Sequence, residues 1–406
     1  MRATVIGELE GTAAGATAEK VLRACVHCGM CNATCPTYAL TGDELDGPRG
    51  RIYLIKQVLE GEPADRLTQH HLDLCLSCRA CETTCPSSVE YHRLFDIGSE
   101  AVARQVRRPL REQMARWGIR ILFSHPRLLA PLFALARVAS PVLPRSLTRQ
   151  IGPGARPRSE ASRPPVAGTR RMSSLPGCVQ AAAAPQIDEA ARRVFAHAGV
   201  ALSPARGVGC CGALAFHTGA GDVARDLARR NIDVWRADLA EGAEAVVITA
   251  SGCAAFVRDY RDLLADDPDY ASAAAQISAA VRDPAELIAD APLTPARLPK
   301  AKRIAVHDPC TLRNGVRLDG VPAGILARVG YEPQPTGEAH MCCGSAGAYS
   351  LLHPATAGAL RTRKLAALGA ARVEGVCTAN IGCQLHLCAG TDTPVRHWLV
   401  AVAEVL

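Results

Sequence analysis

Two runs of four cysteines constrain this chain more than any other feature. The first run, CVHCGMCNATCP, has cysteines at positions 25, 28, 31 and 35, and the second, CLSCRACETTCP, has them at 75, 78, 81 and 85. Each cysteine of the second run therefore lies fifty positions after its counterpart. The pattern C-x2-C-x2-C-x3-C-P is that of [4Fe–4S] ligands, in which three closely spaced thiolates bind one cluster and the fourth cysteine reaches the other.

This spacing predicts two crossed ligand sets. The first thiol set is Cys25, Cys28, Cys31 and Cys85, and the second thiol set is Cys75, Cys78, Cys81 and Cys35. The prolines that follow, Pro36 and Pro86, remove a backbone N–H and turn the chain away from the last ligand. Structural zinc sites normally use two distant C-x2-C pairs. Here four cysteines lie within eleven residues, which does not fit that arrangement. A zinc-stabilised scaffold subunit is the alternative from a different class, and it predicts colourless protein without acid-labile sulfide.

Eight further cysteines form an internal duplication. Between Cys178 and Cys210-Cys211-Gly212 there are 31 residues, and the same number separates Cys310 from Cys342-Cys343-Gly344. Each copy ends on one more cysteine after a predicted strand. Loops at the carboxyl ends of parallel strands are where α/β sheets bind ligands. We therefore expect two further metal sites, the first module site (Cys178, Cys210, Cys211 and Cys253) and the second module site (Cys310, Cys342, Cys343 and Cys383).

Other residues near these cysteines leave alternatives open. His307, His340 and His386 are close enough in sequence to be ligands or proton donors. Buried free cysteines also behave as small hydrophobic residues, so the eight thiols could be purely structural. Cys377 and Cys388 are left over, and the strand pattern around Cys377 predicts that it belongs to the core.

The residue pattern predicts an α+β multidomain protein. Residues 1–100 form an α-helical ferredoxin-like domain with two [4Fe–4S] clusters, because Ile52, Ile55 and Val58 recur at helical spacing. Residues 101–171 are a basic linker or helical docking segment. Residues 172–295 and 296–406 each alternate short strands with helices, which predicts two copies of an α/β module with a largely parallel sheet.

The segment 101–171 is strongly basic, with fifteen arginines against two acidic residues. It is either a solvated linker with one or two packed helices or a docking surface for an acidic partner or an anionic membrane. Nucleic acid is not expected as a partner, because no aromatic residues are interleaved with the arginines. Its apolar stretch 121–144 contains two arginines, a histidine and four prolines, so no transmembrane segment is predicted.

The remaining motif searches exclude several functions. The N-terminus lacks the apolar core of a signal peptide, so we expect a cytoplasmic chain with reduced thiols. No G-x-G-x-x-G follows a strand, and neither G-x-x-x-x-G-K-[ST] nor G-x-S-x-G occurs, so no dinucleotide, nucleoside triphosphate or serine-hydrolase site is predicted. A chain of this kind cannot take a hydride from an organic substrate alone and needs a partner that does so.

Several longer stretches carry a resemblance over essentially the whole chain. They include CVHCGMCNATCPTY, GDELDGPRGRIYLIKQVLEG, HLDLCLSCRACETTCP, HDPCTLR and HMCCGSAGAYS. On these stretches the chain resembles the iron–sulfur subunits of glycolate oxidase (glycolate dehydrogenase). The resemblance implies an FAD-binding subunit and a second flavoprotein-like subunit as partners. It also implies oxidation of glycolate to glyoxylate at the flavin, with electrons passed through the two clusters to quinone or another acceptor.

In such a complex this chain is a subunit of an oxidoreductase and carries no catalytic residue for the organic substrate. Its location is then cytoplasmic, with peripheral attachment to the inner face of the membrane as a further hypothesis. The same machinery serves lactate and anaerobic glycerol-3-phosphate systems, which are the nearest alternatives. A third alternative makes the duplicated half itself the site of disulfide or quinone chemistry.

Two departures from the resemblance bear on the sites. Ser88 stands where a glycine is expected, which alters a turn and leaves the ligands in place. The duplicated half resembles heterodisulfide reductase subunits, whose repeats end in a C-x2-C pair. In this chain the second cysteine of each pair is replaced, by Phe256 after Cys253 and by His386 after Cys383. The two [4Fe–4S] clusters are therefore the principal cofactor expectation, and a further metal or iron–sulfur centre in the repeats is secondary.

Overall fold

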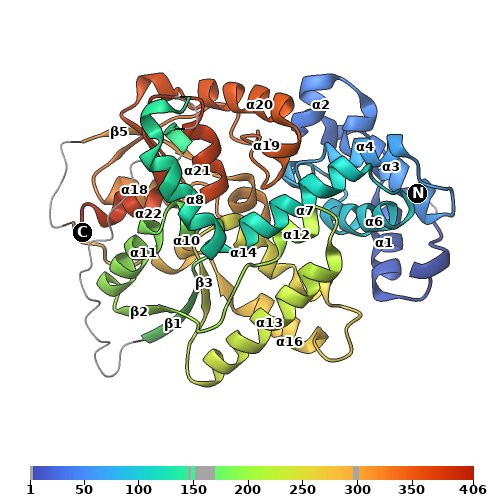
Figure 1. The fold of residues 1–406 in the computed structure, drawn as a ribbon, viewed down its shortest axis with the longest axis horizontal. Helices are drawn as coiled ribbons and strands as arrows, with labels where there is room; N and C mark the ends of the chain where they lie inside the picture. The colour runs from blue at the N-terminus through green and yellow to red at the C-terminus, as the bar shows by residue number, and fades with distance from the viewer. Residues whose placement is uncertain (1–2, 145–147, 151–169, 296–300) are drawn as a thin grey trace.

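The computed structural model describes residues 3–144, 148–150, 170–295 and 301–406. Figure 1 shows a helical N-terminal unit at one end of the molecule and two α/β modules beside it. Helices α7 (Leu110–Ser124) and α8 (Pro126–Val138) cross one face of the molecule, from the N-terminal unit towards the second module. The fold class is thus the predicted one, a helical domain followed by two α/β modules. The domain boundaries at residues 100, 171 and 295 stay predictions.

The N-terminal unit is helical because its apolar residues follow the helical period. On α3, Ile52, Ile55 and Val58 are all buried, as the sequence pattern predicts. Gly98 of α6 lets this helix approach Ile55 closely. The helices of this unit are α1 (Ala13–Ala24), α2 (Pro36–Thr41), α3 (Pro48–Leu59), α4 (Arg66–Asp73), α5 (Ala80–Thr83) and α6 (Tyr91–Gln105), with 3-10 turns at Gly7–Leu9, Met30–Thr34 and Glu44–Asp46.

The two modules have the same topology. Each contains a four-stranded, fully parallel sheet, in the order β2-β1-β3-β4 in the first module and β6-β5-β7-β8 in the second. The strands are β1 (Arg170–Leu175), β2 (Val200–Pro204), β3 (Val246–Ile248), β4 (Val281–Arg282), β5 (Arg303–His307), β6 (Glu332–Gln334), β7 (Gly375–Thr378) and β8 (Val395–His397). The internal duplication seen in the cysteine spacing is therefore a duplication of the fold.

Helices connect these strands, as parallel pairing requires. In the first module they are α10 (Val179–Ala183), α11 (Gln186–His197), α12 (Ala213–His217), α13 (Gly221–Ala240), α14 (Ser251–Arg258), α15 (Tyr260–Leu263), α16 (Ala271–Ala280) and α17 (Pro284–Ile288). In the second they are the π-helical turn η5 (Thr311–Val316), α18 (Val321–Arg328), α19 (Tyr349–Leu352), α20 (Pro354–Ala367), the 3-10 turn η6 (Ala370–Arg372), α21 (Ile381–Cys388) and α22 (Trp398–Ala403).

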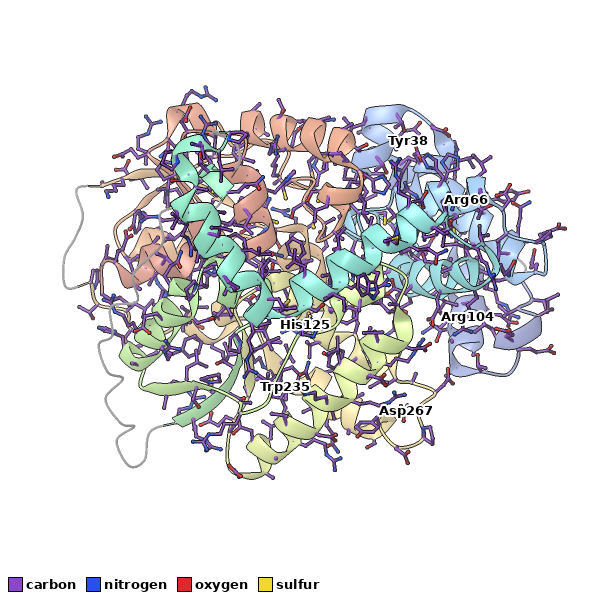
Figure 2. The ribbon with its side chains drawn as sticks, viewed as in Figure 1. Tyr38, Arg66, Arg104, His125, Trp235 and Asp267 are labelled. Atoms are coloured by element: carbon purple, nitrogen blue, oxygen red, sulfur yellow. The ribbon has the colours of Figure 1, made fainter. Side chains whose placement is uncertain are left out.

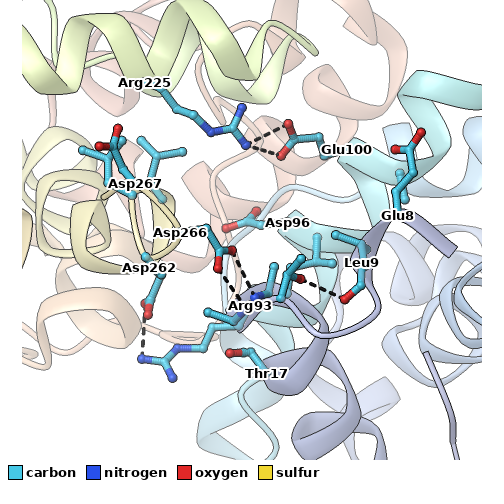
Figure 3. A pocket seen from close by; sticks show the side chains of 18 of the residues that line it. Glu8, Leu9, Thr17, Arg93, Asp96, Glu100, Arg225, Asp262, Asp266 and Asp267 are labelled. Carbon is cyan, nitrogen blue, oxygen red and sulfur yellow. Dashed lines mark hydrogen bonds and ion pairs between the residues drawn. The ribbon is translucent and has the colours of Figure 1, made fainter. Parts of the chain in front are cut away.

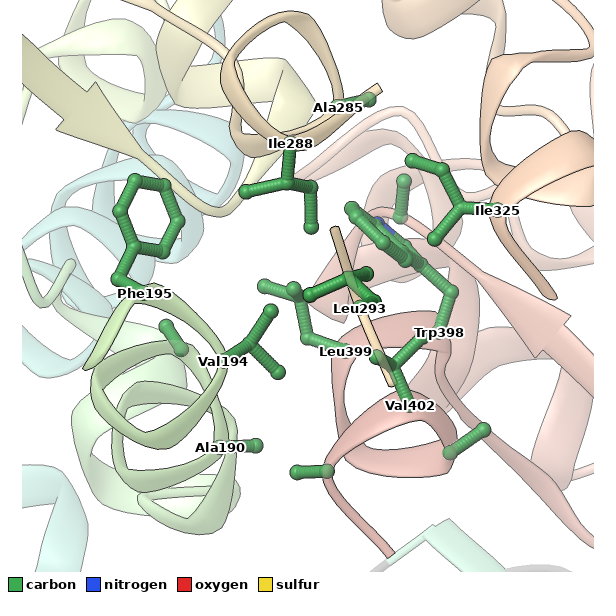
Figure 4. Packing of buried hydrophobic residues seen from close by; sticks show 14 of the residues in the cluster. Ala190, Val194, Phe195, Ala285, Ile288, Leu293, Ile325, Trp398, Leu399 and Val402 are labelled. Atoms are coloured by element: carbon green, nitrogen blue, oxygen red, sulfur yellow. The ribbon is translucent and has the colours of Figure 1, made fainter. Parts of the chain in front are cut away.

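One hydrophobic core joins the two modules. Val194 and Phe195 of α11 pack in the same cluster as Trp398, Leu399 and Val402 of α22 (Figure 4). These five side chains are at most 1 % exposed. Burial of large side chains contributes about 1.5–3 kcal/mol each. The modules therefore form one packed body and hold their cysteine loops at a fixed distance from each other.

The sequence pattern located half of the strands. The apolar runs in MSSLPGC, AVVITASGC, RIAVHDPC and VEGVCTANIGC predict strands. They correspond to β1, β3, β5 and β7, which are the two central strands of each sheet. The strands β2, β4, β6 and β8 were missed, and each is an edge strand of two to five residues. Such short segments carry no periodicity of their own, because pairing with a longer neighbour is what makes them extended.

Candidate metal centres

The first thiol set lines a single pocket of the N-terminal unit. Cys25, Cys28, Cys31 and Cys85 all border it, together with residues of α3. Burial and, to a smaller extent, the neighbouring thiols of Cys25, Cys85 and Cys28 together raise the pKa of Cys31 to about 11. Thiols gathered in this way are stable as thiolates only when a cation binds them. The donor set therefore fits a metal cluster.

The second thiol set gathers in the same manner but lies deeper. Cys35, Cys78 and Cys81 are buried, whereas Cys28 of the first set is exposed. Burial raises the pKa of Cys78 well above its usual value, and the nearby thiols of Cys310 and Cys35 add to the rise. The structure thus brings Cys35 of the first run to the second run, as the crossed pattern predicts. Ligation by either set stays a prediction.

The loops that carry these thiols share a left-handed backbone. His27 and Gly29 in the first run have φ values of 57° and 82°, and Ser77 and Arg79, fifty positions later, have 49° and 57°. Left-handed conformation costs a non-glycine residue about 1–2 kcal/mol. The turn folds backbone amides towards sulfur, since the His27 amide lowers the pKa of Cys25 against the larger, opposing effect of burial. Such hydrogen bonds favour the thiolate form.

A fully buried arginine lies beside the second thiol set. Arg51 is 1 % exposed, and its Nη2 donates to Thr37 Oγ1 at 3.1 Å and lies 3.9 Å from Asp46 Oδ1. Thr37 Oγ1 in turn lies 3.3 Å from Cys35 Sγ. Burial opposes the charge of Arg51, but the thiols of Cys75 and Cys35 and the Asp46 carboxylate keep its pKa above the ordinary value. A buried cation needs anions around it, and thiolates supply them.

The first module site brings its four thiols into two close pairs. Cys210 Sγ lies 3.4 Å from Cys178 Sγ, and Cys211 Sγ lies 3.3 Å from Cys253 Sγ. Cys178 precedes α10, and Cys253 lies in the first turn of α14. Hydrogen bonds from the thiols of Cys178 and Cys211 lower the pKa of Cys210. The same sulfur contacts raise the pKa of Cys178 and Cys211, so the thiols of this site titrate as one interacting group.

The second module site includes a histidine. His307, Cys343 and Cys383 have ligand atoms within 4.8 Å of one another, and all three residues are buried. Cys310 Sγ and Cys342 Sγ lie 3.9 Å apart. Thr378 Oγ1 lies 3.0 Å from Nδ1 of His307, which leaves Nε2 for another contact.

The other histidines considered from sequence lie differently. His386 Nε2 is 3.1 Å from the carbonyl oxygen of Ala357, and His340 is outside the group around His307. Cys377 is fully buried in β7, so its predicted place in the core is confirmed. Cys388 is half-buried and its Sγ lies 3.6 Å from the carbonyl oxygen of Val395.

The second thiol set and the second module site are neighbours. Asn314 Nδ2 donates to the carbonyl oxygen of Cys78 at 2.7 Å. Cys78 also packs in one apolar cluster with Cys342, and Cys310 lies against that cluster. The loops of the two module sites adjoin as well. Ser251, two residues before Cys253, has its Oγ 2.8 Å from Oγ1 of Thr311, which follows Cys310. Cysteine-bearing loops thus follow one another from the N-terminal unit through both modules.

Two buried cations at these sites were missed from the sequence. Arg51 lies on the apolar face of α3, and Lys364 continues the buried stripe of Ala357 and Leu360 on α20. Burial lowers the pKa of Lys364, while the thiols of Cys343 and Cys342 oppose that change. The sequence could have indicated these residues, because each is a cation at an apolar position of an amphipathic helix. It could not have shown which cysteines each cation lies beside.

A separate cleft of about 1120 Å³ lies between α6, the N-terminal residues and the first module (Figure 3). Ion pairs cross it, including Arg225 with Glu100 at 2.7 Å and Arg93 with Asp262 at 3.2 Å. Asp96 points into the cleft (Figure 3), and burial raises its pKa to about 7. None of the described lining residues is a cysteine.

Comparison with known proteins identifies the two parts of the chain. A family model described as a 4Fe-4S dicluster domain matches residues 21–89, and one described as a cysteine-rich domain matches residues 173–258 and 304–388. The glycolate oxidase iron-sulfur subunit of Escherichia coli is 44 % identical over 406 residues, which cover 100 % of this chain and 99 % of that protein.

More distant relatives cover less. The probable glycolate oxidase iron-sulfur subunit of Bacillus subtilis is 29 % identical over 399 residues, with 91 % of this chain and 88 % of that protein covered. Lactate utilization protein A of Shouchella clausii is 26 % identical over 211 residues, with 48 % of this chain and 82 % of that protein covered.

Proposed function

Because the chain belongs to the family of glycolate oxidase iron-sulfur subunits, we propose that it is the electron-transfer subunit of a complex that oxidises glycolate to glyoxylate. In this proposal FAD is bound by a partner subunit, a second flavoprotein-like subunit completes the complex, and quinone or another acceptor receives the electrons. The observation that carries it is the full-length identity of 44 % together with eight thiols gathered into two sets. Two [4Fe–4S] clusters are the cofactors, and each accepts and releases single electrons when bound.

This chain's own residues position and insulate the two clusters. We assign Cys25, Cys28, Cys31 and Cys85 to one and Cys75, Cys78, Cys81 and Cys35 to the other. Left-handed loop residues present amides to the sulfur atoms. Tyr91 Oη donates to Cys75 Sγ at 3.7 Å and holds that thiolate in place.

The two sets differ in their access to solvent. Cys28 is exposed between Val26 and Met30, which are 66 % and 55 % exposed. The second set is covered by the second module through Asn314 and the apolar cluster around Cys342. We therefore place the flavoprotein subunit at the Cys28 loop, since an exposed apolar patch marks a protein contact.

We further propose that the cysteine-rich modules hold an additional metal or iron–sulfur centre. Sulfur atoms 3.3–3.9 Å apart in both modules, with His307 in the second, support it. The test is an anaerobic count of iron, zinc and acid-labile sulfide. A variant with Cys178, Cys210, Cys310 and Cys342 changed to serine should lose iron, whereas Cys388→Ser should not. About eight irons in all three proteins would contradict the additional centre.

The substrate assignment is tested on the co-purified complex. Glycolate should support faster dye reduction than lactate or glycerol-3-phosphate, because the relative that matches over the full length is named as a subunit of glycolate oxidase. The match to lactate utilization protein A covers only 48 % of this chain, yet it makes lactate the competing substrate. Faster turnover with lactate would replace the proposed substrate and leave the electron-transfer role intact. Zinc without sulfide would instead remove the electron-transfer role.

We place the complex on the cytoplasmic side of the cell membrane. The cysteine count and the absence of disulfide bonds among the described residues support a reducing compartment.

A further inference from the structure

Exposed apolar side chains concentrate on α7 and α8. The described part of the chain has seventeen large apolar side chains that are exposed, and nine of them lie between residues 110 and 142. They are Leu110, Met114, Trp117, Ile121, Leu128, Leu132, Leu135, Val138 and Val142. A monomeric protein seldom leaves so many together without a contact that covers them.

These side chains share one face of each helix. On α7 they follow at intervals of four, three and four residues, and on α8 from Leu128 to Val138 at four, three and three. Such spacing places them in one stripe along the helix. The stripe is therefore built by the sequence and is not a scatter of unrelated exposed residues.

The opposite face of the helix pair is fixed to the body of the protein. Arg116 Nη2 lies 3.1 Å from Asp73 Oδ2, and Arg120 Nη1 donates to the carbonyl oxygen of Thr218 at 3.2 Å. Arg137 Nη2 donates to the carbonyl oxygen of Ala183 at 3.1 Å, and Leu129 is buried. These contacts leave the apolar stripe pointing outwards.

The charges around the stripe are mostly positive. Arg107, Arg111 and Arg127 are exposed, and a single carboxylate occurs between residues 107 and 144. The one acidic residue there, Glu112, is half-buried and lies 3.0 Å from Arg66. Ordinary protein surfaces mix both signs, whereas helices that bind anionic lipid carry cations beside an apolar face.

The pair is suited to lie on a membrane. Among the described residues no single helix is long and apolar enough to cross a bilayer. α7 and α8 reach the required hydropathy only together, and they meet at 90°. Their 15 and 13 residues correspond to about 20 Å each, short of the ~30 Å hydrocarbon core. Figure 1 shows both helices crossing the same face, with His125 at their junction in Figure 2.

We propose that the exposed stripe of α7 and α8 inserts into the interfacial layer of a membrane that contains anionic lipid. The apolar side chains enter the acyl boundary, and Arg107, Arg111 and Arg127 bind lipid phosphates. This inference deepens the proposed function, because it brings the chain to the membrane where a quinone acceptor resides. The lipid contact itself involves neither glycolate nor the partner subunits.

The experiment uses the full-length chain purified anaerobically with its iron. It is mixed with vesicles of phosphatidylglycerol and phosphatidylcholine, or of phosphatidylcholine alone, and floated through a density gradient. The chain should float with the anionic vesicles. Trp117 is 59 % exposed, whereas Trp235 and Trp398 are at most 1 % exposed, so a blue shift and quenching by brominated acyl chains report Trp117. Trp117→Phe should remove this signal.

Variants separate insertion from other causes. The double variant Leu132→Glu/Leu135→Glu should weaken binding by at least about tenfold, because both exposed side chains would then carry charge. Val223→Glu, at a 50 % exposed position on α13, should bind like the unchanged chain. Unchanged iron content in all variants shows that they are folded.

Two results would overturn the proposal. One is the absence of flotation with either vesicle. The other is protection of Trp117 from acrylamide by co-purified flavoprotein subunits, without a response to vesicles, which would assign the stripe to a protein partner. Glycolate-dependent dye reduction is measured separately. Its loss with vesicle binding retained would contradict the proposed function and leave this inference standing.

Discussion

At the scale of single residues, Arg51 places a permanent positive charge beside the second thiol set. Its guanidinium is anchored by the carbonyl oxygen of His71 at 2.7 Å and by Thr37. His71 Nδ1 in turn lies 2.8 Å from Asp46 Oδ1, so the surrounding groups are fixed as well. Nearby charge and hydrogen bonds to sulfur are among the factors that set iron–sulfur reduction potentials. We therefore expect the charge of Arg51 to influence the reduction potential of the cluster that the second set is predicted to bind.

Replacing Arg51 tests this role. Arg51→Met should shift one of two reduction potentials to more negative values, because a buried cation stabilises the more negative, reduced form. Arg51→Lys should restore part of the difference. The measurement is a redox titration followed by electron paramagnetic resonance on iron-replete protein, with Arg66→Met as the control. Unchanged potentials in an iron-replete Arg51→Met protein would refute the electrostatic role.

Asp96 gives a pH dependence of stability. Burial raises its pKa from 3.8 to about 7, and Arg79 and His92 only partly offset this. Between about pH 4 and 7 the folded state keeps the proton that the unfolded state releases. Stability from this group is thus present below pH 4 and is lost as the pH rises through 7. The gain in melting temperature of Asp96→Asn should grow between pH 4 and 8, and exposed Asp222→Asn should show no such trend. A constant difference across that range would contradict the shift.

At the scale of elements, the contact between α3 and α6 depends on a missing side chain. A Cβ on Gly98 would lie 2.5 Å from Ile55 Cγ2, whereas one on Gly118 of α7 would meet nothing within 4 Å. Ile55 is fully buried and cannot move aside easily. The position therefore controls how closely α3 and α6 pack.

Two matched glycine substitutions measure this packing. Gly98→Ala should lower the free energy of unfolding by about 1–3 kcal/mol through overpacking. Gly118→Ala should raise it by about 0.5–1 kcal/mol, because alanine suits an exposed helix better than glycine. Denaturant unfolding monitored by circular dichroism compares them. Equal effects of the two substitutions would mean that α6 can shift away from Ile55 at little cost.

At the scale of the whole molecule, one thiol set is open and the other is covered. The loop around Cys28 faces solvent, while the second set lies under the second module. The two modules in turn share one core through α11 and α22. The exposed Cys28 loop lies at one end, and covered cysteine loops follow behind it, so the two ends of this series differ in their access to solvent.

This difference predicts where the flavoprotein subunit acts. Val26→Glu/Met30→Glu should slow reduction of the chain by glycolate through its partner by about tenfold or more, because charge opposes an apolar contact. Reduction by dithionite should be unchanged, since it needs no docking. Leu67→Glu, at a 59 % exposed position on α4, is the control. Slower reduction by dithionite as well would show damage to the thiol set instead.

Much of the fold and the grouping of the thiols could be predicted from the sequence, while their role as cluster ligands stays a prediction. Cysteine spacing limits which thiols can share a cluster, because three cysteines separated by two residues each can bind the same cluster while the fourth reaches the other. The repeated 31-residue interval likewise identified the duplicated module, and both central strands of each sheet followed from apolar runs. These are local properties, set by covalent spacing and by the period of apolar residues.

The tertiary structure alone decided how the sites relate to one another. Cys78 meets Cys310, His307 joins Cys343, and Arg51 faces Cys35 and Cys75 only after elements distant in sequence have packed. The same holds for the exposed apolar stripe of α7 and α8, since spacing predicts an amphipathic helix, but only packing shows which face is covered. The pKa and the burial of a side chain depend on which residues surround it in space, whereas the sequence shows only which residues adjoin it along the backbone.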